Sequence, residues 1–193
     1  MMVRVGLVCV VSVLLLGCSS DGGNKIGEGL SRVVGRALAP ENDQAVPLDN
    51  GTVVLLQYDE DGNIVSAEVG TTNENGEFQV DVEAQAVIAM VVGGMTEEGE
   101  TEISGLYNPE DGATLEKELN PATSIACVAG LSAIDDGSIT QEELDEMRVQ
   151  NLEDASADYI EANPEFDYYE QSDFDAAVEA VRTATNDGSN PAP

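Results

Sequence analysis

Cysteine thiols and carboxylates are the side chains through which this sequence could do chemistry. The chain contains three Cys, 38 Asp and Glu residues, and no His. Without His there is no imidazole base, no His-dependent catalytic triad and no His metal ligand. The chemistry left open is acylation of a thiol, binding of a cation by carboxylates, and hydrolysis by a carboxylate pair.

Cys18 stands at the end of an apolar N-terminal segment. Arg4 precedes a largely apolar run of 12 residues, 5–16. This run is shorter than the roughly 20 residues that span a bilayer, and it is typical of a secretory signal peptide. It ends in Leu15-Leu16-Gly17-Cys18, which resembles the lipobox of bacterial lipoproteins, although Leu16 is bulkier than the usual second residue. The resemblance implies cleavage between Gly17 and Cys18 and a lipid on the Cys18 thiol. The alternative is an ordinary signal peptide with an incidental Cys.

The same resemblance implies a location in the cell envelope. In Gram-negative lipoproteins, an Asp directly after the Cys retains the protein at the inner membrane, and Ser19 stands there instead. We therefore expect a protein anchored to the outer membrane by its lipid, facing the periplasm or the cell surface. Each buried CH₂ of a lipid chain contributes about 0.8 kcal/mol, so a multiply acylated Cys18 would hold firmly.

After cleavage, the sequence keeps two of its three Cys residues, Cys18 and Cys127. Because Cys18 is expected to carry lipid, no disulfide is expected. The apolar neighbours of Cys127 predict a buried and unreactive thiol.

Two segments imitate part of an EF-hand calcium loop. Asp59, Asp61 and Glu68 match loop positions 3, 5 and 12 in the first, and Asp136 and Glu143 match positions 5 and 12 in the second. Calcium needs six or more converging oxygens, and both segments lack the Asp of position 1. A hairpin turn explains the first segment and a helix start explains the second. These residues are therefore weak metal candidates, and weak Ca²⁺ binding stays an alternative to having no cofactor beyond the lipid.

Composition and periodicity divide the chain into five parts. Residues 1–17 form the predicted signal peptide, residues 18–29 a Gly- and Ser-rich flexible tether, and residues 186–193 a disordered tail. Residues 30–119 alternate short β-type runs with turn signals, and residues 120–185 have helical periodicity. The pattern predicts a mainly β fold with α: a seven-strand antiparallel β-sandwich followed by about three C-terminal helices. The strands are expected at residues 31–39, 51–58, 64–71, 77–82, 86–92, 100–107 and 113–119, with a polar loop at residues 40–50.

Three motifs within residues 31–94 resemble the carboxypeptidase regulatory-like, or transthyretin-like, sandwich family. They are Val34-Gly35-Arg36, the Val46-Pro47-Leu48 loop, and residues 71–78, where a Thr and a polar turn lead to Gly76 and Phe78. Gly76 is expected to have a positive φ, and Phe78 to enter the core. A generic Ig-like or pilin-type sandwich is the alternative.

Helix signals are clear after Asn120. Asn120-Pro121 predicts an N-cap followed by Pro at the first helical position, with the helix reaching Ile134. Thr140 and Glu143 have the spacing of a capping box and predict the start of a second helix. Its apolar stripe is expected at Leu144, Met147, Leu152, Ala155 and Tyr159, and a third helix is expected behind Ser172.

The formal charge of −31 excludes most nucleic-acid binders, because such a surface repels phosphates. The charge is even along the chain, with −17 in residues 18–119 and −15 in residues 120–193, which favours general solvation over one binding patch. Because salt shortens the Debye length from about 10 Å at 0.1 M to about 3 Å at 1 M, it should relieve this self-repulsion. We expect the melting temperature to rise from low to molar NaCl, and an unchanged melting temperature would contradict this reading.

The functional prediction is a non-catalytic, lipid-anchored envelope lipoprotein that serves as an accessory binding or structural module. Its expected partners are the membrane, through the lipid, and an envelope protein or a glycan, but no nucleic acid. A carbohydrate- or calcium-binding module is the alternative. Exposed Tyr58, Tyr107, Tyr168 or Tyr169 converging on one face would favour it, and buried or scattered tyrosines would disfavour it. A small carboxylate-dependent hydrolase ranks third, because only 4% of residues are aromatic and no aromatic-rich segment accompanies a carboxylate pair.

Overall fold

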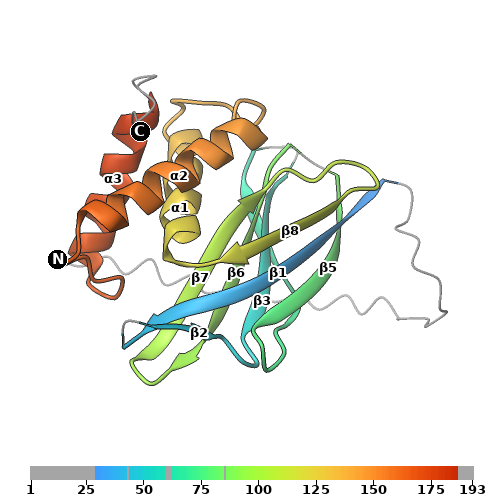
Figure 1. Cartoon of the computed structure of the whole chain (residues 1–193). Helices are drawn as coiled ribbons and strands as arrows, with labels where there is room; N and C mark the ends of the chain where they lie inside the picture. Colours follow the sequence, from blue (N-terminus) through green and yellow to red (C-terminus); the bar gives the residue numbers. More distant parts are fainter. Residues whose placement is uncertain (1–28, 43, 60–61, 85, 187–193) are drawn as a thin grey trace.

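The computed structural model describes residues 29–42, 44–59, 62–84 and 86–186. They form eight strands: β1 (Leu30–Glu41), β2 (Gln44–Pro47), β3 (Thr52–Tyr58), β4 (Ile64–Thr71), β5 (Glu77–Glu83), β6 (Ile88–Thr96), β7 (Gly99–Tyr107) and β8 (Thr114–Leu119). Three helices follow: α1 (Pro121–Asp135), α2 (Glu146–Ala162) and α3 (Gln171–Asn186). Figure 1 shows the helices gathered on one side of a body of two sheets.

The strands form two four-stranded sheets. One sheet has the order β4-β3-β6-β7 and is antiparallel throughout. The other is built around β1, which pairs antiparallel with β5 and β2 and parallel with β8. The predicted mainly β sandwich followed by three helices is confirmed.

Two details of the sheets differ from the sequence expectation. The described residues form eight strands rather than seven, because residues 44–47 of the expected polar loop pair with the end of β1, from Leu38↔Pro47 to Glu41↔Gln44. The sandwich is also not antiparallel throughout, since β8 runs parallel to β1 from Arg32↔Thr114 to Ala37↔Leu119. A turn signal in the sequence indicates where a strand ends, but it does not indicate which other strand that strand pairs with. These pairings could therefore not be predicted from the local sequence.

The turn before β5 has the predicted geometry. Gly76 has a φ of +74°, and a Cβ there would lie 2.5 Å from the carbonyl oxygen of Ala37. Phe78 follows and is buried. Thr72 is buried beside this turn, where its hydroxyl donates to the Leu48 carbonyl and accepts from the Gly51 N–H at 2.8 Å. This hydroxyl joins the start of the β4–β5 turn to the loop after β2.

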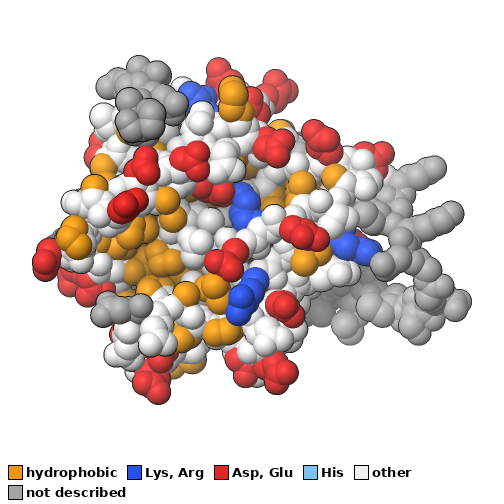
Figure 2. All heavy atoms as spheres, in the orientation of Figure 1, with side chains coloured by type: hydrophobic (Ala, Val, Ile, Leu, Met, Phe, Trp, Pro, Cys, Tyr) orange, Lys and Arg blue, Asp and Glu red, His pale blue; other side chains and the backbone are white. Residues whose placement is uncertain are grey.

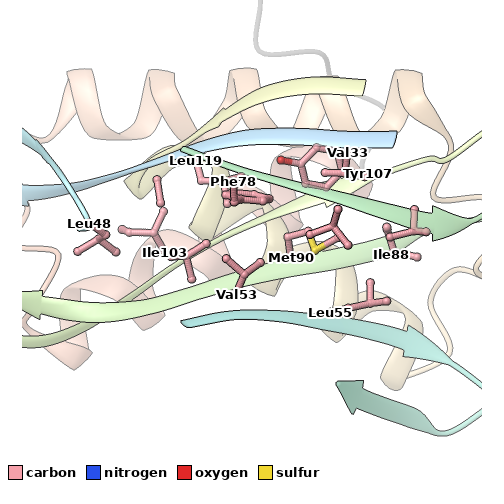
Figure 3. Packing of buried hydrophobic residues seen from close by; sticks show 14 of the residues in the cluster. Val33, Leu48, Val53, Leu55, Phe78, Ile88, Met90, Ile103, Tyr107 and Leu119 are labelled. Carbon is pink, nitrogen blue, oxygen red and sulfur yellow. The ribbon is translucent and has the colours of Figure 1, made fainter. Parts of the chain in front are cut away.

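The first core lies between the two sheets. Alternate residues of β3, β5, β6 and β7 point into it, as the period of two in a strand requires. Figure 3 shows these side chains meeting between the sheets; the labelled ones are Val33, Leu48, Val53, Leu55, Phe78, Ile88, Met90, Ile103, Tyr107 and Leu119.

The second core lies between the helices and the outer face of β6 and β7. Ala89 and Leu106 face outward from those strands and pack with Ile125 and other buried residues of the helices. The start of α1 is bonded to β7, because Thr123 Oγ1 donates to the Ser104 carbonyl at 2.7 Å and Ser124 Oγ accepts from the Ser104 N–H at 2.9 Å. The helices are therefore fixed to the sandwich by packing and by buried hydrogen bonds.

The second helix begins later than predicted. Thr140 and Glu143 do exchange the hydrogen bonds of a capping box, but they close a turn, and α2 starts after the N-cap Asp145. Met147, expected in the buried stripe, is 70% exposed, and Val149 is buried in its place. Leu152 and Ala155 are buried as predicted, so the difference from the expected stripe lies at the start of α2. For α1 the prediction is confirmed, with Asn120 as N-cap.

No helix in the described part of the chain is both long enough and apolar enough to cross a membrane.

Candidate functional site

The predicted lipidation and cleavage residues, Gly17 and Cys18, lie outside the described residues. The first described residue is Gly29, whose N–H donates to Asp111 Oδ1 at 2.7 Å. The chain therefore enters the sandwich at the start of β1, next to the β7–β8 loop.

The first calcium candidate is a hairpin turn between β3 and β4. Asp59 Oδ1 accepts the N–H of Asn63 at 2.8 Å, and the Asp59 carbonyl accepts the N–H of Gly62 at 3.0 Å. Glu68 lies further along β4, opposite Val54. Asp61 lies outside the described residues.

The second candidate is the segment between α1 and α2. Asp136 accepts the N–H of Ser138 at 2.9 Å and forms an ion pair with Arg182 of α3. Glu143 Oε2 accepts the N–H of Thr140 at 2.8 Å. Within residues 29–42, 44–59, 62–84 and 86–186, no three Cys, Asp or Glu side chains are gathered as metal ligands.

The hydrogen bonds of Asp136 are expected to affect how the stability of the protein changes at acid pH. Bonds from Ser138, reinforced by Arg182, hold the pKa of Asp136 below its ordinary value of 3.8. A carboxyl group whose folded pKa is lowered stabilises the protein above its unfolded pKa, and the contribution disappears as pH falls through the folded pKa. We expect Asp136→Asn to lose less stability than the unsubstituted protein between pH 5 and pH 3. Thermal melts at both pH values test this, with the exposed Asp158→Asn as control; equal losses in all three would contradict it.

Cys127 is confirmed as a buried thiol. It is 2% exposed on α1, and burial raises its pKa to about 11. Because the thiolate is the reactive form, iodoacetamide at pH 8 should leave Cys127 unmodified in the folded protein and alkylate it in guanidinium. Mass spectrometry of the peptide that holds residue 127 provides the measurement. Rapid alkylation of the folded protein would contradict the buried position.

The tyrosines named for the carbohydrate alternative do not converge on an exposed face. Tyr107 is 3% exposed in the core between the sheets, and Tyr58 packs against the helical core. Tyr168 Oη donates to the Glu102 carbonyl at 2.6 Å, and burial raises its pKa to about 12. Tyr169 Oη donates to the Pro40 carbonyl, also at 2.6 Å. Tyr168 and Tyr169 therefore tie the α2–α3 loop to β7 and β1.

Lys117 forms a polar contact that the sequence analysis missed. Its Nζ donates to the Leu106 carbonyl at 2.7 Å and to Glu153 Oε1 of α2 at 2.5 Å, and it lies 5.2 Å from the centroid of the Tyr107 ring. Leu115, Lys117 and Leu119 alternate along β8 and share one face, so the pattern did indicate that Lys117 points inward. Its acceptor on α2 left no local signal.

Two of the concave surfaces on the described part of the molecule have volumes above 700 Å³. One, of about 870 Å³, is a shallow hollow on the outer face of β8, β1 and β5, where Arg36 lies near Glu118. The other, of about 770 Å³, is a groove between α2 and the ends of β7 and β8. Figure 2 shows that carboxylates are spread over the visible face with few basic side chains among them.

The groove combines an apolar floor with charged edges, and it is built from three separate elements. Its apolar residues include Leu106 of β7, Leu115 of β8 and Val149 of α2. Asn108 braces its wall, since Nδ2 donates to the carbonyls of Ala86 at 2.6 Å and Leu144 at 2.8 Å. Ligand sites commonly lie where two layers of a structure meet in this way, so this groove is the candidate functional site.

Comparisons with known proteins show little likeness. No protein-family model matches the chain, and no curated protein matches it in sequence. Among solved structures, a DUF3823 family protein from Parabacteroides merdae is 17% identical, with a TM-score of 0.33, over 49% of this chain and 46% of its own. A proposed carbohydrate-binding protein from Pseudomonas aeruginosa is 13% identical, with a TM-score of 0.34, over 50% of this chain and 90% of its own. A 9R-lipoxygenase from Cyanothece is 15% identical, with a TM-score of 0.29, over 54% of this chain and 18% of its own.

Proposed function

We propose that this chain is a bacterial lipoprotein, anchored to the outer membrane through a lipid on Cys18, that acts as a non-catalytic accessory module for another component of the envelope. The observation that carries the proposal is the sequence Leu-Leu-Gly-Cys at residues 15–18, which overlaps the end of the largely apolar run 5–16. An ordinary signal peptide needs no Cys at this position.

The position of the folded domain supports this proposal. Ten residues, 19–28, lie between Cys18 and Gly29, so eleven residue steps connect the candidate anchor to the folded domain. At about 3.3 Å per extended residue, they hold the sandwich within about 36 Å of the lipid surface. A domain tethered so closely would meet other components of the same membrane.

The chemistry of the described side chains supports a binding role rather than a catalytic one. The chain has no His, and its Cys127 thiol is buried with a raised pKa. Within the sandwich, Gly76 has a positive φ and Phe78 is buried, which supports the resemblance to the transthyretin-like family. We propose that the sandwich is of this type, which implies an accessory role beside enzymes or transporters.

Fractionation of a Gram-negative host that produces the full chain tests the proposal. The unsubstituted protein should sediment with outer membranes, and Cys18→Ser should leave the membrane fraction. Cys127→Ala is the matched control, since it removes the other thiol expected in the mature chain and should not affect attachment. By the lipoprotein sorting rule, Ser19→Asp should move the protein to the inner membrane. Equal membrane attachment of Cys18→Ser and the unsubstituted protein would refute the lipid anchor.

A further inference from the structure

The groove between α2 and the ends of β7 and β8 has the form of a binding site for a short chain segment. It encloses about 770 Å³, within the range of roughly 300–1,000 Å³ that ligand pockets occupy. The β7–β8 loop forms one wall, and the α1–α2 connection with the first turns of α2 forms the other. Figure 1 shows α2 lying above β8 and β7. Residues of these three elements line the groove.

The floor and lip of the groove are apolar. Leu106 and Val149 are buried beneath it, while Leu115 is half-buried. Met147 lines the groove and is 70% exposed, which is unusual for a large apolar side chain. An unbranched, polarisable Met at the edge of a groove adapts to different apolar side chains of a ligand.

The walls carry an excess of negative charge. Five carboxylates line the groove, from Glu110, Glu116, Glu142, Asp145 and Glu146. Asp145 caps α2 by accepting the Arg148 N–H at 2.8 Å. Among the described residues, the other four carboxylates have no hydrogen bond or ion pair. The single ammonium in the lining belongs to Lys117, and Glu153 already pairs with it.

We infer that this groove binds a basic, amphipathic segment of another envelope protein, one with apolar side chains flanked by Lys or Arg. The stems of such residues would lie on Leu115 and Met147 while their charged heads reach the carboxylates on both walls. A second copy of this chain is a poor occupant, because both copies carry −31 and only seven basic residues each. The inference rests on the accessory role proposed above and adds the chemistry of the partner.

Fluorescence anisotropy with two labelled peptides tests the inference. The probes are the amidated peptides KKLLKKLLKK and KKSSKKSSKK, which carry equal charge, and the protein is the full chain in a neutral detergent at about 0.15 M NaCl. We expect the Leu peptide to bind at least about tenfold more tightly than the Ser peptide, because only the Leu peptide can fill the apolar floor.

Matched substitutions locate the binding. Met147→Ser should weaken binding of the Leu peptide about fivefold, whereas Met95→Ser, at the equally exposed Met95 on β6, should change it less than twofold. Glu110→Gln with Glu142→Gln should also weaken binding about fivefold. Glu74→Gln with Glu100→Gln removes the same charge outside the groove and should have less than a twofold effect.

Three results would overturn the inference. The first is equal binding of the two peptides, which would mean general attraction to an acidic surface. Equal weakening by the double Glu substitutions inside and outside the groove would mean the same. The second is displacement of the Leu peptide by spermine at equal charge concentration, which would mean a site for small organic cations. The third is no binding of either peptide. Because the assay does not depend on the lipid, its failure leaves the anchor at Cys18 to be tested separately.

Discussion

Gly35→Ala is expected to lower the free energy of unfolding by about 2 kcal/mol, although it adds only one methyl group. Gly35 lies in β1 directly opposite Phe78 of β5, and both are buried. A Cβ at Gly35 would overlap the ring of Phe78. Overpacking a core lowers the free energy of unfolding by about 1–3 kcal/mol. Replacing Gly by Ala also restricts the unfolded chain, and this stabilising effect offsets only part of the loss.

A double-mutant cycle identifies the cause of that loss. Phe78→Ala alone should cost about 3–5 kcal/mol, because it empties the space above Gly35. In the Phe78→Ala background, Gly35→Ala should cost nothing or restore some stability, since the overlapping ring is gone. Urea denaturation of the four proteins gives the coupling energy. If the losses of the two single variants in the free energy of unfolding were additive, the overlap with the Phe78 ring would not be the reason why Gly is needed at residue 35.

Lys117→Ala is expected to lower the free energy of unfolding by about 2–3 kcal/mol. The Lys117 and Glu153 side chains are 21% and 15% exposed, so removing Lys117 leaves the Glu153 carboxylate and the Leu106 carbonyl without their partner. Breaking a fully buried ion pair costs about 3–5 kcal/mol, and the remaining solvent contact here reduces that figure. The variant should also loosen α2 from the sandwich.

The surface pair Arg36–Glu118 is the control for this prediction. Its atoms are 4.0 Å apart and its side chains 46% and 52% exposed, so Arg36→Gln should cost less than about 0.5 kcal/mol. Lys117→Met combined with Glu153→Leu should recover most of the loss, because it removes both charges at similar volume. If Lys117→Ala and Arg36→Gln have equal small effects in urea denaturation, the contact between β8 and α2 does not stabilise the fold.

The elements that the sequence predicts well are those with a local cause. The turn at Gly76 needs a positive φ that few residues other than Gly adopt, and the N-cap Asn120 before Pro121 is recognisable within two residues. The burial of Cys127 follows from its apolar neighbours. In each case the signal and the structure lie within a few positions of each other.

The features that the sequence does not predict depend on residues far apart in the chain. The parallel pairing of β8 with β1 joins Ala37 to Leu119, and no local pattern distinguishes it from an antiparallel pairing. The candidate groove has the same origin, because its walls come from the β7–β8 loop and from α2. The delayed start of α2 shows a different limit, since the Thr140–Glu143 hydrogen bonds close a turn as readily as they cap a helix.

Mass spectrometry of the N-terminal peptide tests most directly whether Cys18 anchors this protein to a membrane. The protein should be purified from membranes of a bacterial host that processes lipoproteins. We predict that residues 1–17 are absent and that the first residue is a Cys18 whose mass includes a diacylglycerol. A peptide that still contains residues 1–17, or a mature chain with an unmodified Cys18 thiol, would mean that Cys18 carries no lipid anchor.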